Sequence, residues 1–231
     1  MLDKYLDRLL YSSLFDGFDF ETLKGMKGCL DLSLNQYEKG QNIVYRGDDF
    51  TKIGIVANGG ATVLKENALG ARNIVELLTV GAVFGEMAAF SKKAVWNFTV
   101  QANQNCKIIF IPKGRILGEC QRLCPCHRRL IENFLTILSD RGLFLDKKIE
   151  YLTIKSVIGK ISAYLYDQYL SHEKTSFELG LNRSELADFL CVSRPTLSRE
   201  MAALRYKGII DFYLNHIKIK DIEALKEYLI N

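Results

Sequence analysis

The hydrophobic residues of this chain follow two different periods, and the change between them divides the sequence. From about Cys29 to Pro112, short apolar runs such as NIVYRGD, KIGIVANGG and CKIIFIP are separated by Gly, Asn and Asp. Many short strands at regular spacing, with turn residues between them, are typical of a β-sandwich or a β-barrel. The segment from Leu2 to about Leu23 has a helical pattern and is expected to form short helices that flank the barrel.

A different pattern begins after Pro125 and predicts one long helix. Its apolar stripe has alternating spacings of four and three residues and consists of Ile131, Leu135, Leu138, Gly142, Leu145, Ile149 and Leu152. A stripe this narrow suits a partner helix, although packing against the chain's own barrel would also produce it. We therefore predict a dimerisation helix over residues 125–152 and a parallel homodimer, in which Gly142 permits close approach of the two chains.

The stripe ends at TIKS, Thr153 to Ser156, which is interpreted as a hinge before a second helical pattern. The remaining residues are predicted to be helical except GIIDFYLNHIKIKD. Its two alternating apolar runs around Asn215 and His216 predict a β-hairpin. The predicted domains are therefore residues 1–124, the helix over 125–152, and residues 153–231.

Two helix starts lie close together in NRSELADFLCVSRPTLSREMAALRYKG, which spans residues 182–208. Asn182 and Ser193 are predicted N-caps, and Pro195 lies in the first turn of the second helix, where its missing N–H costs nothing. Only LCVS separates the two helices. This spacing is that of a helix-turn-helix, in which the second helix enters the major groove of DNA.

The start of the second helix carries side chains that suit DNA. Arginine can bond bidentately to guanine, and serine or threonine can contact phosphates or base edges. The predicted DNA-binding residues are Arg194, Thr196, Ser198, Arg199 and Ser193, together with Arg183 and Ser184. Lys218 and Lys220 on the hairpin are within possible reach of a phosphate. The alternative is an ordinary pair of helices with solvated arginines.

Composition narrows the class of protein further. The chain has 231 residues, of which 48% are hydrophobic and 25% charged, and its net charge of +4 is too small to indicate nucleic acid by itself. No apolar run is long enough for a membrane span or has the form of a signal peptide, so we expect a cytoplasmic protein with no membrane partner. The six cysteines are too unevenly spaced for a disulfide framework and are expected to be reduced.

The order of these parts resembles the CRP/FNR family of bacterial transcription regulators over essentially the whole chain. FGEMAAF is similar to the family's effector-loop motif, and VSRPTLSRE is similar to its recognition helix. The resemblance implies an α+β protein with an N-terminal β-roll of the jelly-roll type, a long dimerisation helix and a C-terminal winged helix-turn-helix. It also implies that Arg194 and Arg199 read double-stranded DNA, and that RNA polymerase is a partner. Pro195 replaces a Glu that many members use to bind cytosine.

The effector loop departs from the members that bind cyclic AMP. In those members the Glu of the loop, here Glu86, holds the ribose, and an Arg followed by Ser or Thr clamps the phosphate. Trp96 and Asn97 occupy the latter positions, and tryptophan cannot neutralise a buried phosphate. Lys92 and Lys93 are expected to be solvated at the loop tip. We therefore expect an effector other than cyclic AMP.

An apolar or aromatic effector would suit the aromatic residues around this loop. The predicted pocket consists of Phe84, Gly85, Glu86, Trp96, Asn97 and Phe98, with Leu145 at its border. The alternative is that the aromatic residues are core and that Glu86 only holds the loop backbone. No cofactor is predicted with certainty.

A second candidate sensor is CQRLCPCH, where Cys120, Cys124 and Cys126 precede His127. Such thiols can bind metal or sense oxidants, but inert reduced thiols are the favoured interpretation, and no metal site is predicted. A redox-, metal- or haem-dependent sensor of the same family and an effector-independent DNA binder remain alternatives. An enzyme of the cupin type is not expected, because all three histidines lie outside the predicted barrel.

Overall fold

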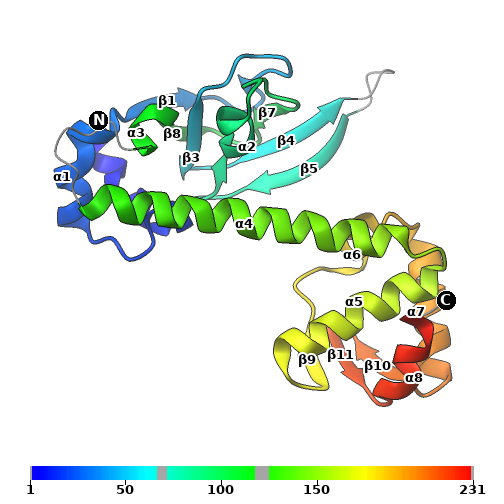
Figure 1. Cartoon of the computed structure of the whole chain (residues 1–231). Helices are drawn as coiled ribbons and strands as arrows, with labels where there is room; N and C mark the ends of the chain where they lie inside the picture. Colours follow the sequence, from blue (N-terminus) through cyan, green and yellow to red (C-terminus); the bar gives the residue numbers. More distant parts are fainter. Residues whose placement is uncertain (1, 67–71, 118–124, 230–231) are drawn as a thin grey trace. The chain divides into compact units, whose positions relative to one another are not determined.

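The computed structural model of the chain describes residues 2–66, 72–117 and 125–229, coloured along the sequence in Figure 1. These residues form two compact units, Met1–Asp140 and Arg141–Asn231. The boundary lies inside the longest helix. Each unit has its own hydrophobic core and is described by itself.

The first unit begins with short helices, as the pattern of residues 2–23 predicts, but the last helix continues to Leu30 and includes Cys29, where the strand pattern was expected to begin. They are η1 (Leu2–Tyr11), η2 (Ser13–Phe15) and α1 (Phe20–Leu30). The carboxylate of Asp19 caps α1 by accepting a hydrogen bond of 2.7 Å from the backbone N–H of Thr22. The apolar residues of the three helices are buried in a common core with one face of the first sheet.

Two four-stranded antiparallel sheets make up the β-roll. The first has the order β1 (Ser33–Tyr37), β8 (Cys106–Pro112), β3 (Lys52–Asn58) and β6 (Val83–Phe84). The second has the order β2 (Asn42–Val44), β7 (Thr99–Ala102), β4 (Ala61–Glu66) and β5 (Arg72–Leu78). Neighbours in each sheet are mostly distant in sequence, as expected for a jelly roll.

Strand β3 is buried on both of its faces because it separates two clusters of apolar side chains. Ile53 and Ile55 pack with the N-terminal helices, whereas Val56 belongs to the cluster between the two sheets. Gly54 is required here, since a Cβ at this position would lie 2.2 Å from the ring of Phe84. The interior of the roll is therefore packed around an aromatic ring.

The long helix α4 (Pro125–Thr153) matches the helix predicted for residues 125–152, and its first half has a second apolar stripe that the sequence analysis did not separate. Leu130 and Phe134 are buried against the N-terminal core, and the Phe134 ring lies 4.4 Å from that of Phe90. The amide of Asn133 donates to the carbonyl oxygens of Leu14 and Asp16 at 3.1 and 2.9 Å. The residues of α4 that pack on the chain's own N-terminal core, Leu130 and Phe134, thus form a stripe beside the one predicted to form the dimer contact.

The second unit contains the end of α4, four further α-helices and a small sheet. The helices are α5 (Val157–His172), α6 (Arg183–Phe189), α7 (Arg194–Tyr206) and α8 (Ile222–Lys226), followed by η3 (Glu227–Leu229). Antiparallel strands β10 (Ile210–Tyr213) and β11 (His216–Ile219) form the predicted hairpin beside α7 (Figure 1).

Three short elements were not predicted. Strand β9 (Ser176–Glu178) extends the hairpin to a three-stranded sheet, although its segment was expected to be helical. Only Phe177 is buried in this strand, so a strand of three residues offers no alternating pattern to detect. Helix α2 (Glu86–Phe90) is a single turn in a stretch expected to be a loop, and α3 (Lys113–Ile116) is a single turn in a stretch for which the sequence pattern gave no expectation.

Candidate nucleic-acid interface and sensor site

Helix α7 is held by an apolar face that packs on the core of the second unit. Leu197, Met201 and Leu204 are fully buried there. The helix begins at its predicted cap, since the hydroxyl oxygen of Ser193 accepts a hydrogen bond of 3.2 Å from the backbone N–H of Thr196. This anchoring fixes which side of α7 meets solvent.

Helix α6 and the turn that follows set the position of α7. Asn182 and Glu185 form a capping box, in which the Glu185 carboxylate accepts from the Asn182 backbone N–H at 2.7 Å. The turn closes with a hydrogen bond of 2.9 Å from the Val192 N–H to the Ala187 carbonyl. Cys191 has a φ of 53°, the left-handed conformation that glycine adopts more readily.

The start of α7, with its N-cap Ser193, carries five of the seven predicted DNA-binding residues. Arg194, Ser198 and Arg199 are exposed at its N-terminal end, and the Arg199 guanidinium lies 3.8 Å from the Glu200 carboxylate. Thr196 is half-buried, and its hydroxyl lies 2.7 Å from that of Ser193. The structure thus presents two arginine side chains and one serine hydroxyl on the same helix start.

Arg183 has a different environment from the exposed arginines. Its guanidinium lies over the ring of Phe212 at 4.6 Å, and its Nη1 donates to the sulfur of Met201. Its Nη2 donates to the carbonyl oxygen of Leu214 at 3.4 Å. Burial lowers the pKa of this guanidinium. Arg183 therefore connects α6 to α7 and to the hairpin, a role that the sequence pattern did not reveal.

The hairpin is fixed to α7 by a cluster of charges. The Asp211 carboxylate pairs with Arg205 at 2.8 Å and with Lys220 at 3.0 Å. These contacts, the hydrogen bond to Lys220 first, lower the pKa of Asp211. Arg205 also lies 5.1 Å from the Phe212 ring. Lys218 and Lys220 are both exposed, but Lys220 is held by its ion pair with Asp211.

A hollow of about 430 Å³ opens between α6, the start of α7 and the hairpin turn. It is lined by Asn182, Arg183, Ser184, Arg194, Phe212, Leu214 and Asn215. None of these lining residues, all from the described part of the chain, is acidic. Among the described residues, neither Arg183 nor Arg194 has a carboxylate partner. The hollow is therefore cationic and suits an anion such as a backbone phosphate.

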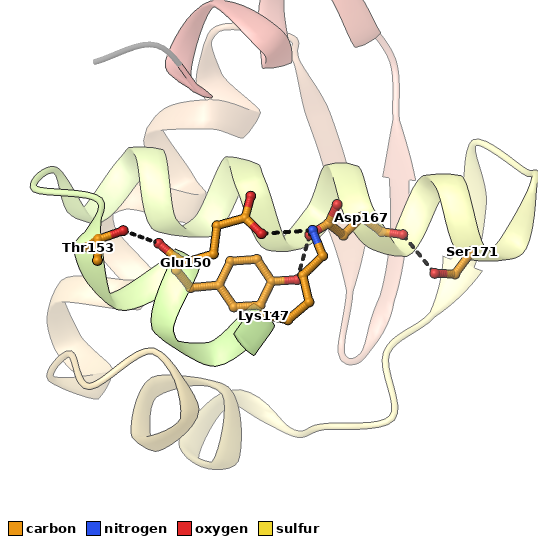
Figure 2. A network of polar contacts seen from close by, with 6 residues as sticks. Lys147, Glu150, Thr153, Asp167 and Ser171 are labelled. Atoms are coloured by element: carbon orange, nitrogen blue, oxygen red, sulfur yellow. Dashed lines mark hydrogen bonds and ion pairs between the residues drawn. The ribbon is translucent and has the colours of Figure 1, made fainter. Parts of the chain in front are cut away.

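The break between α4 and α5 is braced by side chains, as Figure 2 shows. Asp167 of α5 accepts from the hydroxyl of Tyr151 at 2.7 Å and pairs with Lys147 at 3.0 Å, and Lys147 also pairs with Glu150 at 3.0 Å. Tyr151 is buried beside the rings of Tyr164 and Phe189. The segment interpreted as a hinge is thus a corner within one compact unit.

The predicted effector residues form an aromatic cluster inside the roll. The Trp96 side chain is 7% exposed, and its ring centroid lies 5.4 Å from that of Phe50, 6.4 Å from Phe84 and 6.1 Å from Phe98. Its buried Nε1 has no hydrogen-bond partner within the described residues. These rings pack as core.

The loop around the predicted effector motif is shaped by two residues. Gly85 has a φ of 89° and touches Phe50 so closely that a Cβ would lie 2.1 Å from that ring. Glu86 follows as the first residue of α2 and is buried. Asn97, Lys92 and Lys93 are exposed. The structure thus brings five of the six predicted pocket residues together, while Asn97 lies at the surface.

The cysteine cluster falls largely outside the described residues. This applies to Cys120 and Cys124, whereas Cys126 is half-buried against the N-terminal core and His127 is buried. In the part of the chain with described positions, no three His, Cys, Asp or Glu side chains are grouped as metal ligands. In the same part of the chain, no helix has the length and apolar character to cross a membrane.

Comparison with known proteins agrees with this architecture. Residues 34–122 match the cyclic nucleotide-binding domain, and residues 159–228 match the Crp-like helix-turn-helix domain. Over 197 residues the chain is 25% identical to the transcriptional activator protein FnrL of Cereibacter sphaeroides, covering 83% of this chain and 78% of FnrL. Over 203 residues it is 22% identical to the cyclic AMP receptor protein of Thermus thermophilus, covering 86% and 91% of the two chains.

A solved structure shows the same fold. The crystal structure of the Thermus thermophilus catabolite activator protein superimposes with a TM-score of 0.54 at 21% identity, covering 95% of this chain and 99% of that one. A cyclic nucleotide-binding domain followed by a Crp-like helix-turn-helix domain is the arrangement of a class of DNA-binding transcription regulators. The chain belongs to the CRP/FNR family of transcription regulators.

The braced corner makes the second unit sensitive to alkali. Burial, and then the hydrogen bond to Asp167, raise the pKa of Tyr151 above its ordinary value. The unfolded chain, in which this hydroxyl has its ordinary pKa of about 10, ionises before the folded chain does. The stabilisation of the folded state is therefore complete below about pH 10 and is lost as the pH rises above that value. Tyr151→Phe should therefore lower the free energy of unfolding at pH 8 but reduce its fall between about pH 9 and pH 11.

Urea denaturation followed by circular dichroism at several pH values measures this difference. The exposed Tyr206→Phe is the matched control and should follow the wild-type pH profile. Parallel pH profiles for wild type and Tyr151→Phe would contradict the proposed burial of this hydroxyl.

Proposed function

We propose that this regulator is a homodimer that binds specific duplex DNA through α7 and responds to an effector other than cyclic AMP. The observation that carries the proposal is the pair of exposed arginines, Arg194 and Arg199, near the start of a helix whose apolar face is anchored in the core. A helix presented in this way can enter the major groove end-on.

The side chains on α7 divide into two kinds of contact. Arg194 and Arg199 have donors that can bind guanine O6 and N7 in the major groove. Ser198 can contact a base edge or a phosphate, while Ser193 and Ser184 lie where phosphates would run beside the helix starts. The Pro195 side chain has no hydrogen-bonding group, so it cannot read the base pair opposite it by a polar contact.

The dimer is supported by the uncovered seam of α4. Leu135 and Ile149 are 56% and 60% exposed, and Leu145 and Leu152 are also exposed. Apolar side chains in a heptad stripe normally pack against a partner helix. Ile131 and Leu138 are half-buried in the single chain, and no described atom lies within 4 Å of the point where a Cβ on Gly142 would be. A second copy of α4 would cover this stripe.

The effector is proposed from the chemistry of the roll interior. Trp96 fills the position from which related proteins would clamp a cyclic phosphate, and it brings aromatic surface instead of charge. The nearby Lys92 and Lys93 are solvated. An anion placed among these rings would lack a counter-charge, which costs several kcal/mol. An apolar or aromatic effector with an acceptor for Trp96 Nε1 fits better.

Effector binding would act on DNA through the geometry of the dimer. Two recognition helices can enter successive major grooves only when they lie about 34 Å apart, one turn of the duplex. We propose that the effector changes this spacing by favouring one arrangement of the paired helices. RNA polymerase as a further partner and the cytoplasm as the location follow from the family resemblance.

Arg199→Ala should weaken binding to a selected operator by about 1–3 kcal/mol, because a bidentate contact to guanine is lost. Fluorescence anisotropy with the operator and with random duplex gives the ratio of specific to non-specific affinity. Arg128→Ala is the matched control, since Arg128 is exposed on α4 and pairs with Glu132. Equal losses on both duplexes would assign Arg199 to phosphate binding and not to base readout.

Ile149→Glu should convert the dimer to single chains, because two carboxylates would face each other in the seam. Light scattering coupled to size-exclusion chromatography measures the mass. Leu170→Glu is the control, since Leu170 is similarly exposed but lies on α5. A dimer that persists in Ile149→Glu would place the interface elsewhere.

Cyclic AMP at millimolar concentration should leave both the thermal unfolding midpoint and the operator affinity unchanged. A ligand at 100 times its Kd stabilises the folded state by about 2.7 kcal/mol, which a melting curve detects readily. The cyclic AMP receptor protein of Thermus thermophilus serves as the positive control. A rise in the midpoint would show that Trp96 does not prevent cyclic phosphate binding.

A further inference from the structure

The turn of the β10–β11 hairpin ends in two large apolar side chains. Tyr213 pairs with His216 in the register of the hairpin, so Leu214 and Asn215 form a two-residue turn. Tyr213 is 78% exposed and Leu214 is 73% exposed. Neighbouring apolar residues at a projecting tip are unusual on a surface that only contacts water, and they favour an interaction site.

Leu214 occupies this turn at a conformational cost. Its φ is 53°, in the left-handed region that glycine and asparagine adopt far more readily than leucine. The turn is held on both sides. The Leu214 carbonyl accepts from Arg183, and the Asn215 carbonyl accepts a hydrogen bond of 2.9 Å from the Leu179 N–H. A strained residue that is also exposed indicates a use for its side chain.

The chemistry of the tip does not suit a phosphate. Residues 212–216 read FYLNH and contain no lysine or arginine. The one imidazole, His216, has its Nε2 2.9 Å from the hydroxyl of Ser176. A tip of this kind is suited to contact an apolar surface. The minor groove of DNA offers such a surface, because its walls consist of deoxyribose carbons, and apolar side chains can insert between its base steps.

The hollow beside the tip indicates where the DNA strand would run. Arg194 at the start of α7 and Leu214 at the tip line the same hollow, together with Arg183, which donates to the Leu214 carbonyl oxygen. One sugar–phosphate strand separates the major groove from the minor groove. If α7 lies in the major groove and the cationic hollow receives that strand, then the tip lies on the minor-groove side.

We infer that Tyr213 and Leu214 form an apolar wedge that enters the minor groove beside each half-site. This inference rests on the proposed binding of α7 to DNA. The guanine N2 amino group projects into the minor groove, where it would obstruct an apolar side chain and is absent from A·T pairs. The wedge therefore adds a preference for A·T pairs at positions that α7 does not touch.

Inosine separates the two grooves in an experiment. An I·C pair presents the major-groove pattern of G·C but lacks the minor-groove amino group. Operators selected with the wild-type protein are prepared with A·T, G·C or I·C at the base pairs flanking each half-site. Wild-type affinity should be about 10-fold lower for G·C than for either A·T or I·C.

Leu214→Gly tests the residue itself. This variant relieves the left-handed strain, so its thermal unfolding midpoint should equal or exceed that of the wild type. Its affinity should vary by less than about 2-fold among the three flanking pairs. Leu170→Gly, at an exposed position on α5, should keep the wild-type preference, although glycine within a helix lowers its stability.

Two results would overturn the inference. One is a Leu214→Gly variant that discriminates the flanking pairs as the wild type does. The other is a Leu214→Gly variant with a lower unfolding midpoint and the same loss of affinity for every duplex, which would make the side chain structural. Arg199→Ala distinguishes these results from failure of the proposed function. If it still weakens operator binding selectively, α7 reads DNA and only the wedge is wrong.

Discussion

The burial of one face of α7 is the constraint on which the proposed DNA surface depends. Leu197, Met201 and Leu204 are fully buried, so the helix cannot rotate about its axis without exposing them to water. Because side chains on a helix recur every 3.6 residues, burying these three leaves Arg199 on the outer face, whereas Arg194 is exposed because it is the first residue of the helix. The capping hydroxyl of Ser193 then fixes where the helix starts.

The β-roll obeys a comparable constraint through its aromatic interior. Gly54 and Gly85 leave out side chains where the rings of Phe84 and Phe50 need the space. The rings of Phe50, Phe84 and Trp96 pack against each other, which fits the interpretation of the aromatic residues as core. A sensor built on this interior has to accommodate or displace aromatic rings, because dense packing leaves little empty volume.

Much of this architecture is visible in the sequence because the signals are local. Short strands between turn residues, a stripe with alternating spacings, and two caps separated by a tight turn all depend on near neighbours. The helix-turn-helix is the best example, since Asn182 and Ser193 cap α6 and α7 as predicted.

Interactions between distant residues gave no such signal. Arg183 has a sequence position typical of a phosphate contact, yet its partners Met201, Phe212 and Leu214 lie 18 to 31 residues away. Strand β9 exists only because β11 pairs with it. Leu130 and Phe134 of α4 are buried only because they pack against the N-terminal helices, which are distant in the sequence. Roles of these kinds require the folded chain.

The bracing of the corner by Asp167 has a consequence for how a signal would travel. Tyr151 and Lys147 tie the last turns of α4 to α5, and α5 packs on α7. Leu145 and Ile149 lie on those same turns. The residues proposed to form the dimer contact and the residues proposed to bind DNA thus belong to one connected set of helices. A small rotation of one α4 against the other would displace α7, which is the last helix of this set.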